Sequence, residues 1–265
     1  MMSMIGVAAQ LAQDLLRETR TSDSGHANRP AAVGIVRGWH YAQPVPNFPV
    51  IRSRADSAVP AGRVGYDLTA DRLLLHSFQT EEAFEELLST GRLLPDPGLA
   101  EPLFADAYGW MLREMDRRLP TSGDAALWFW ARTTREGLLD SCRRNRGDVL
   151  LTCRIPREKV LLSQHWDWHC ALNGIPHVLE LPGESHDDFD ARLDRILDEV
   201  DDRKRAAGVL GTGFRDWPDD VRRDLERSWE QFLDPATFGR WDAVQATTHA
   251  LYAEDVVAAV RLRPL

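Results

Sequence analysis

The chain has 265 residues, of which 43 % are hydrophobic, and its formal net charge is −9. This size allows one large domain with a buried core. The acidic excess argues against broad binding to DNA or RNA, which needs a basic surface. The apolar runs are too short to span a bilayer, and Asp14, Arg17 and Glu18 come too early for a secretory signal, so we expect a cytoplasmic protein without a membrane segment.

The first part of the chain differs in composition from the rest. An amphipathic pattern over residues 5–18 is followed by a stretch rich in Pro, Gly, Ser and Ala. Aromatic and aliphatic residues between Gly34 and Ser53 indicate a strand or two within that stretch. We therefore predict a partly irregular N-terminal extension over residues 1–70 and a single α+β domain over residues 71–265.

The segment from Leu73 to Leu94 carries the clearest local pattern. An apolar run that ends in His76 predicts a strand. Thr80 with two following glutamates predicts a helix N-cap, and Gly91 fits a left-handed C-cap. Histidine then lies at a strand–helix junction, where α/β enzymes often carry binding groups. The alternative is a polar side chain satisfied within an ordinary βα unit.

Further elements follow from periodicity and from turn residues. We predict helices over residues 99–119, 187–207 and 217–233, the last with Asp216 as cap and Pro218 in its first turn. The predicted strands cover residues 125–132, 148–155 and 159–163 and two segments of 244–265. Pro156 between the second and third strands indicates a hairpin or a sheet corner. Without regular βαβ alternation, these elements favour an α+β fold with a mixed or antiparallel split sheet.

The absence of known motifs argues against several types of catalytic or cofactor site. The sequence has no GxSxG elbow and no GxxxxGK[ST] loop, and GVLGTG at residues 208–213 follows an acidic helix, so Rossmann-type dinucleotide binding is not expected. Cys142, Cys153 and Cys170 have no CxxC spacing, which indicates reduced, partly buried thiols.

The segment from Ser163 to Gly174 has histidines in a spacing that suits a metal. On a helix, His165 and His169 would lie one turn apart, with Cys170 or His177 as further ligands. The segment lacks the glutamate of HExxH, and no third ligand is fixed by spacing, so we expect no metal. The alternatives are packing of Trp166, Trp168 and His169, or an aromatic wall that faces a ligand.

Two compositional features bear on partners. Carboxylates from Glu180 to Asp202 far outnumber Arg192 and Arg195, which predicts a solvated helix face or an acidic docking surface for a protein. The chain has nine tryptophans, clustered as Trp110, Trp128, Trp130, Trp166 and Trp168. They suit a core or a π-faced ligand such as nicotinamide or adenine, beside Arg132, whose guanidinium can meet phosphate.

Blocks of the sequence carry two resemblances. LHSFQTEEAFEELLSTGRL, FADAYGWMLREMDRR, ALWFWAR, DVLLTCRIPREKVLLSQHWDWHCALNG, RSWEQFLD and VQATTHALYAEDVVAAVRL, within residues 73–263, resemble an uncharacterised bacterial family, domain of unknown function 3841. A second resemblance is to the ADP-ribosyltransferase fold, whose members begin with a histidine-bearing strand and end in a glutamate-bearing strand before a closing hairpin.

The second resemblance implies an ADP-ribosyltransferase-like split sheet and a site for NAD or a related nucleotide. By it, His76 would hold the ribose, Trp128 or Trp130 would pack on nicotinamide, and Gln245 or Thr247 would stand where the family has its glutamate. The implied ligand contacts are His76, Ser77, Tyr108, Trp128, Trp130, Arg132 and Thr247, and the implied catalytic residues are His76, Gln245 and Glu230.

The missing glutamate separates the functional hypotheses. A neutral amide cannot stabilise the positive charge that develops on the ribose as nicotinamide leaves. Either Glu230 or Glu254 supplies the acid, or the domain binds a nucleotide-like ligand without conventional transfer or hydrolysis, or the same cleft carries different chemistry. Two further hypotheses do not involve a nucleotide. The protein is then either a tailoring enzyme for a small metabolite or a non-catalytic interaction module.

Overall fold

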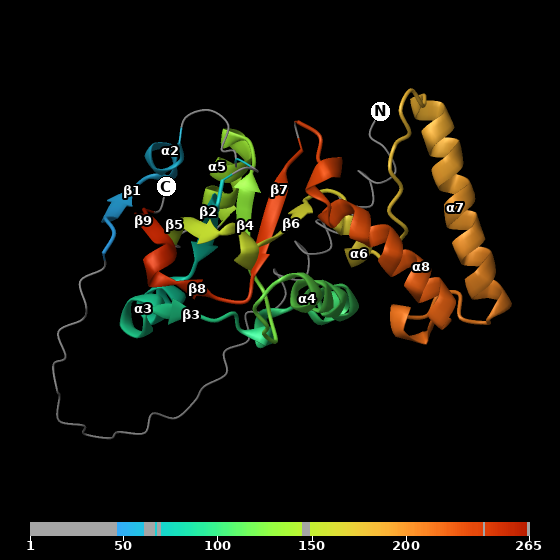
Figure 1. The fold of residues 1–265 in the computed structure, drawn as a ribbon, viewed down its shortest axis with the longest axis horizontal. Helices are drawn as coiled ribbons and strands as arrows, with labels where there is room; N and C mark the ends of the chain where they lie inside the picture. The colour runs from blue at the N-terminus through green and yellow to red at the C-terminus, as the bar shows by residue number, and fades with distance from the viewer. Residues whose placement is uncertain (1–46, 61–66, 68–69, 145–148, 241, 264–265) are drawn as a thin grey trace, which may run out of the picture. The chain divides into compact units, whose positions relative to one another are not determined.

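The computed structural model of the protein describes residues 47–60, 67, 70–144, 149–240 and 242–263 (Figure 1). The helix predicted over residues 5–18 lies outside these residues. One seven-stranded sheet has the order β1-β9-β5-β2-β4-β7-β6. Its strands are β1 (Val50–Ser53), β9 (Val256–Leu262), β5 (Val149–Pro156), β2 (Arg72–Gln79), β4 (Leu127–Arg132), β7 (Val244–Thr248) and β6 (Leu161–Gln164).

The sheet is mostly antiparallel, with β1 and β9 as its parallel pair. A small second sheet joins β3 (Arg92–Leu93) to β8 (Leu251–Tyr252). Helices flank the main sheet, so the predicted α+β class is confirmed. In the part of the chain that the structure describes, no helix combines the length and the apolar character needed to cross a membrane.

The sheet nearly divides between β2 and β4. All of β2 pairs with β5, whereas β2 and β4 share the single register pair His76 and Trp130. Side chains replace part of the missing ladder there: the Ser77 hydroxyl donates to the Trp128 carbonyl at 2.9 Å, and the Gln79 amide donates to the Ser77 hydroxyl at 2.7 Å. This junction brings a histidine and a tryptophan from distant parts of the chain together.

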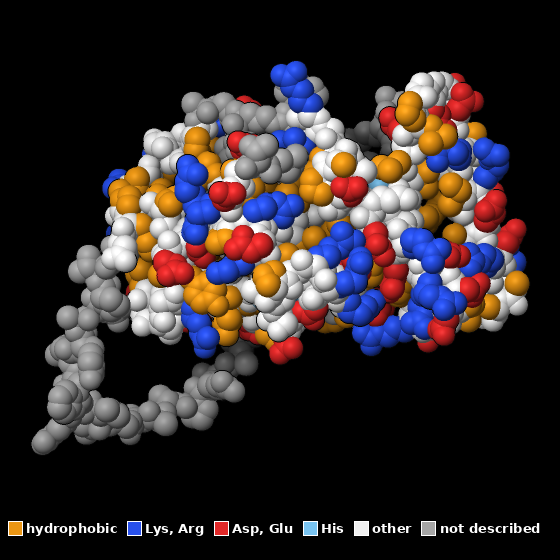
Figure 2. Space-filling model, in the orientation of Figure 1, with side chains coloured by type: hydrophobic (Ala, Val, Ile, Leu, Met, Phe, Trp, Pro, Cys, Tyr) orange, Lys and Arg blue, Asp and Glu red, His pale blue; other side chains and the backbone are white. Residues whose placement is uncertain are grey.

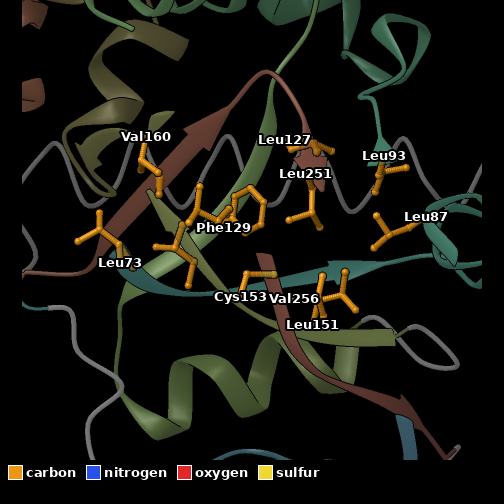
Figure 3. Close-up of a cluster of buried hydrophobic side chains, with 14 of the residues drawn as sticks. Leu73, Leu87, Leu93, Leu127, Phe129, Leu151, Cys153, Val160, Leu251 and Val256 are labelled. Atoms are coloured by element: carbon orange, nitrogen blue, oxygen red, sulfur yellow. The ribbon is translucent and has the colours of Figure 1, made fainter. Parts of the chain in front are cut away.

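The helix α3 (Glu81–Thr90) follows β2 as predicted. The Thr80 hydroxyl accepts from the Ala83 amide at 3.1 Å, and Gly91 ends the helix with φ of 76°, a left-handed conformation that a side chain would strain. The buried face of α3 covers one face of the sheet. Figure 3 shows the resulting apolar cluster, with Leu73, Phe129, Leu151 and Cys153 from the sheet and Leu87 from α3.

Two groups of helices cover the opposite face. The first comprises α4 (Ala105–Arg118), α6 (Trp168–Leu172) and α8 (Asp219–Trp229), and its core is aromatic. Trp110 packs edge-on against Trp229, with ring centroids 5.3 Å apart, and against Phe232 at 5.5 Å. The second comprises α2 (Ala55–Ala58) and α5 (Arg135–Arg144), which pack on Leu150 and Val260.

The helix α7 (His186–Ala206) packs against α8 (Figure 1). Its Ser185 N-cap hydroxyl accepts from the Asp188 amide at 3.2 Å, and Gly208, at φ of 71°, turns the chain after it. The arginine Arg203 links the two helices by pairing with Asp220 at 2.6 Å and Asp224 at 2.9 Å. The buried residues of α7 are Phe189, Leu193 and Val200.

Strand pairing corrects two predictions. β5 and β6 do not form a hairpin, because β2, β4 and β7 lie between them. A short turn at Arg157–Lys159, held by the Arg157 amide donating to the Asp71 carbonyl at 2.8 Å, leads the chain away from β5. Likewise β7 and β9 do not close a hairpin, because β8 between them leaves to pair with β3.

Two local predictions also change. The helix predicted over residues 99–119 begins only at Ala105, because Pro97 and Pro102 each start a separate short 3₁₀ turn. Glu114 of this helix is buried and accepts from Arg117 and Arg118 at 2.6 and 2.8 Å. In α8 the cap is Pro218, and Asp216 ends the preceding 3₁₀ turn.

Candidate functional site

A row of side chains crosses the face of the sheet that carries the two helix groups, and its tryptophan, Trp130, packs against the second group. Strand register places Thr152 opposite His76, His76 opposite Trp130, Trp130 opposite Gln245, and Gln245 opposite Ser163. Because directly opposed residues on adjacent strands point to the same face, these five side chains lie side by side. We call Thr152, His76, Trp130, Gln245 and Ser163 the central row.

His76 is the titratable side chain of the row, and 1 % of its surface is exposed. Its Nδ1 lies 3.2 Å from the Thr152 hydroxyl. Burial lowers the pKa of His76 from 6.5 to about 4, because the charged imidazole loses its hydration. The ring is therefore neutral at pH 7, and its Nε2 offers one hydrogen-bond donor or one acceptor, not a charge.

Three polar atoms of the central row are buried without a hydrogen-bond partner among the described residues. They are His76 Nε2, Gln245 Oε1 and Ser163 Oγ. Leaving a buried polar atom unsatisfied costs roughly 1–3 kcal/mol, so such atoms are rare in folded proteins and call for an explanation. Three of them in one row are the pattern expected where a ligand or ordered water supplies the missing partners.

Aromatic side chains lead from the row to the surface. The Trp130 ring meets His165 edge-on, with centroids 4.9 Å apart, and His165 lies 4.8 Å from Trp166. Trp166 is 49 % exposed, so its packing on His165 and His169 lies at the surface. His169, stacked on Trp166 at 5.8 Å, is buried, as is Trp168. The aromatic wall predicted as an alternative thus has one exposed end.

A family model decides the family of the chain. The family described as Domain of unknown function (DUF3841) matches residues 74–257, which include the whole central row. The chain belongs to this family. Neither a search of curated proteins nor a search of solved structures found a match.

Within the DUF3841 domain, several of the predicted catalytic and ligand-binding residues separate into two rows. His76, Trp130 and Gln245 are in the central row. Trp128 and Thr247 oppose each other two residues further along their strands, on the same face of the sheet. There the ring centroid of Trp128 lies 6.3 Å from that of Tyr108 and 5.4 Å from that of Trp168, beneath the first helix group. This second row is packed against helices, and burial raises the pKa of Tyr108.

Two other predicted contacts have structural partners. The Arg132 guanidinium donates to the Asp242 carbonyl at 2.9 Å and to the Gly239 carbonyl at 2.6 Å, which holds the loop before β7. Ser77 is buried with its hydroxyl on Trp128, as described above. The structure therefore does not bring Arg132 or Ser77 into the central row of the DUF3841 domain.

The two candidate acids lie elsewhere. Glu230 is half-exposed next to the C-terminal end of α4, where its carboxylate is 3.2 Å from Arg117 and 3.5 Å from Arg118. Glu254 belongs to the 3₁₀ turn Ala253–Asp255 between β8 and β9. The central row itself contains hydroxyls, an imidazole, an indole and an amide, and none of its five side chains is a carboxylate.

No group of three or more His, Cys, Asp or Glu side chains among the described residues is arranged to hold a metal ion. His169 Nδ1 instead lies 3.1 Å from the His165 carbonyl, and His177 pairs with Asp167. The three cysteines are free, as predicted, but fully buried. Burial raises the pKa of Cys142 to about 11 and that of Cys170 to about 12, so these thiols stay protonated.

Sequence reasoning missed Thr152 and Ser163. Thr152 directly follows three apolar residues in β5, and Ser163 directly follows two in β6, and this interruption of an apolar run is the signal that marks them. Their connection to His76 and Gln245 required knowing which strands pair. The row thus adds two hydroxyls to the predicted site of the DUF3841 domain.

Proposed function

We propose that the central row binds NAD or a related nucleotide, on a sheet of the ADP-ribosyltransferase type. The observation that carries the proposal is the adjacency of His76, Trp130 and Gln245. The resemblance names His76, one of two tryptophans and one of two residues at the glutamate position, all from segments far apart in the sequence. Strand register makes His76 a neighbour of Trp130, and Trp130 a neighbour of Gln245, on one face. Residues chosen for packing alone would not need to fall into a single row.

The chemistry of the row suits a neutral, hydroxyl-rich part of such a ligand. A buried neutral imidazole and a buried amide oxygen can hydrogen-bond ribose hydroxyls without the cost of burying a charge. The Trp130 indole supplies a flat apolar surface on which a nicotinamide ring can pack. The ligand would supply the partners that His76 Nε2, Gln245 Oε1 and Ser163 Oγ lack.

The same chemistry limits catalysis. Cleavage of the N-glycosidic bond builds positive charge on the ribose, and the amide of Gln245 provides no compensating negative charge. Glu230 is held by two arginines at the end of α4. We therefore propose a nucleotide-binding site in which transfer or hydrolysis is slow, below that of an enzyme with a carboxylate at this position by about 10²-fold or more.

Calorimetric titration of the full chain with NAD and with ADP-ribose tests binding. Two substitutions of His76 form a matched pair, because the amide of asparagine occupies the place of Nδ1 and that of glutamine the place of Nε2. His76→Asn keeps a hydrogen-bond partner for Thr152 but loses the atom at Nε2. We expect it to weaken NAD binding by about tenfold or more, and we expect His76→Gln to weaken NAD binding less. Absence of binding for both ligands at millimolar concentration would refute the proposal.

A further inference from the structure

Trp166 lies in the connection between β6 and α6 and is the most exposed of the tryptophans that the structure describes (Figure 1). Folding usually buries most of a tryptophan side chain. Figure 2 shows apolar side chains scattered among charged ones on the surface, so exposure alone does not mark a site in this protein. Trp166 differs from a scattered apolar residue because other aromatic rings support it and connect it to the central row.

Two imidazoles support the indole from one side. Trp166 lies 4.8 Å from His165 and is stacked on His169 at 5.8 Å, with an angle of 26° between the planes. The two imidazole centroids are 5.2 Å apart, so both rings lie on the same side of the indole. His169 Nδ1 is 3.1 Å from the His165 carbonyl and 3.3 Å from the Trp166 carbonyl, and carbonyls only accept, so this nitrogen donates and holds its ring in place.

The backbone on both sides of Trp166 is also held. The His165 amide donates to the Ala243 carbonyl at 2.9 Å, beyond the last register pair of β6 and β7. The Asp167 amide donates to the Gln164 side-chain oxygen at 2.7 Å. The indole is therefore a positioned surface, and a ligand that stacks on it loses little affinity to the ordering of the protein.

The aromatic contacts continue from this surface into the central row. His165 meets the Trp130 ring edge-on at 4.9 Å, so it contacts both tryptophans. Trp130 and Gln245 are only partly buried, and Ser163, at the end of the row, precedes Trp166 by three residues. A ligand that lies on Trp130 and extends beyond β6 would reach Trp166.

We propose that Trp166 stacks the second base of the bound nucleotide, so that the ligand class is a dinucleotide with its nicotinamide and ribose on the central row and its adenine on Trp166. This inference rests on the proposed function, because it takes the row as the site of the nicotinamide and its ribose. Adenine offers a flat π face, and stacking of a base on an indole needs no charged partner. A nicotinamide mononucleotide lacks this second base and occupies the row alone.

Calorimetric titration with NAD and with nicotinamide mononucleotide tests the assignment on the full chain, on Trp166→Ala and on Trp166→Phe. We expect the unchanged chain to bind the mononucleotide about tenfold or more weakly than NAD, because stacking on Trp166 is lost. Trp166→Ala should weaken NAD binding by about the same factor and leave the affinity for the mononucleotide unchanged. Trp166→Phe keeps a smaller ring and should lose less affinity for NAD.

Tyr252→Ala is the matched control, since it removes another partly exposed aromatic ring, from β8 in the second sheet, and should change neither affinity. If Trp166→Ala does not fold, Trp166→Phe takes its place. Equal affinities for NAD and the mononucleotide, or an equal loss of both in a folded Trp166 variant, would refute the adenine site and leave the row as a nucleotide site. Absence of binding for every nucleotide would refute the proposed function itself.

Discussion

The central row and a cavity of about 510 Å³ between α7 and α8 each have a buried histidine, His76 and His177, and the two differ in what fixes the ring. The Thr152 hydroxyl at 3.2 Å contacts His76, whereas the Asp167 carboxylate at 3.0 Å contacts His177. A hydroxyl can donate or accept, so His76 can present either kind of atom to a ligand. A carboxylate only accepts, so the Nε2 of His177 carries a proton that faces Asp167. The partner of a buried imidazole thus decides how firmly the position of its proton is fixed.

The two regions also differ in how they are held together, and a pair of tryptophan substitutions sharpens this difference most strongly. Trp110 is fully buried among Trp229, Phe232 and Trp168 in the helices beside the cavity. We expect Trp110→Ala to lower the free energy of unfolding by about 3–5 kcal/mol, as deletion of a buried aromatic side chain usually does. Chemical denaturation measures the loss.

Trp130→Ala is the matched change in the row, where the side chain is only partly buried. It should cost clearly less stability and instead weaken NAD binding. Equal destabilisation by the two substitutions would mean that Trp130 is a core residue like Trp110, and the distinction between a packed helical region and a ligand-facing row would fail.

A pH dependence of stability is expected from His76. Its pKa is about 4 in the folded chain and about 6.5 when unfolded, so the unfolded state binds the proton more tightly. The resulting stability is fully present above pH 6.5 and is lost as pH falls toward 4, by about 3 kcal/mol for a shift of this size. His76→Gln removes this titration.

Denaturation of both proteins between pH 4 and 7 isolates the contribution of His76, because His169 and His249, whose pKa values burial also lowers, are common to both. The difference between the two curves should grow steadily below pH 6.5. Parallel curves would show that His76 is hydrated in solution, and the description of the row as a buried neutral surface would be wrong.

Replacing Gln245 tests whether the row differs from a transferase site by one charge. If the row holds NAD with its ribose near Gln245, then Gln245→Glu places a carboxylate where positive charge develops and should raise nicotinamide release by about 10²-fold. Gln245→Met has similar bulk and no charge, so it should give no increase. Chromatographic measurement of nicotinamide gives the rates. An unchanged rate in a Gln245→Glu protein that still binds NAD would exclude N-glycosidic chemistry at the row.

Local signals predicted the parts of the fold that depend on neighbours in sequence. The N-cap Thr80, the C-cap Gly91 and the alternation of Trp128 and Trp130 each act within a few residues, and the structure has them as predicted. Strand pairing depends on contacts between distant segments, and it was there that the hairpins were mispredicted. Thr152 and Ser163 were missed for the same reason, since a polar residue in a strand acquires meaning only from the residue opposite.

The smallest expected effect concerns Thr152, which touches His76 and, in the proposal, no ligand. Thr152→Val removes one hydrogen bond of the imidazole at nearly constant shape, and its cost in stability should be about 1 kcal/mol. If the hydroxyl only packs, NAD affinity will not change, but if it orients His76, affinity will fall. Thr152→Ser keeps the hydroxyl and should restore affinity, and calorimetry on the three proteins measures it. A serine variant as weak as the valine variant would show that the methyl group, and not the hydroxyl, matters, and His76 would then lack the orienting partner on which its contrast with His177 depends.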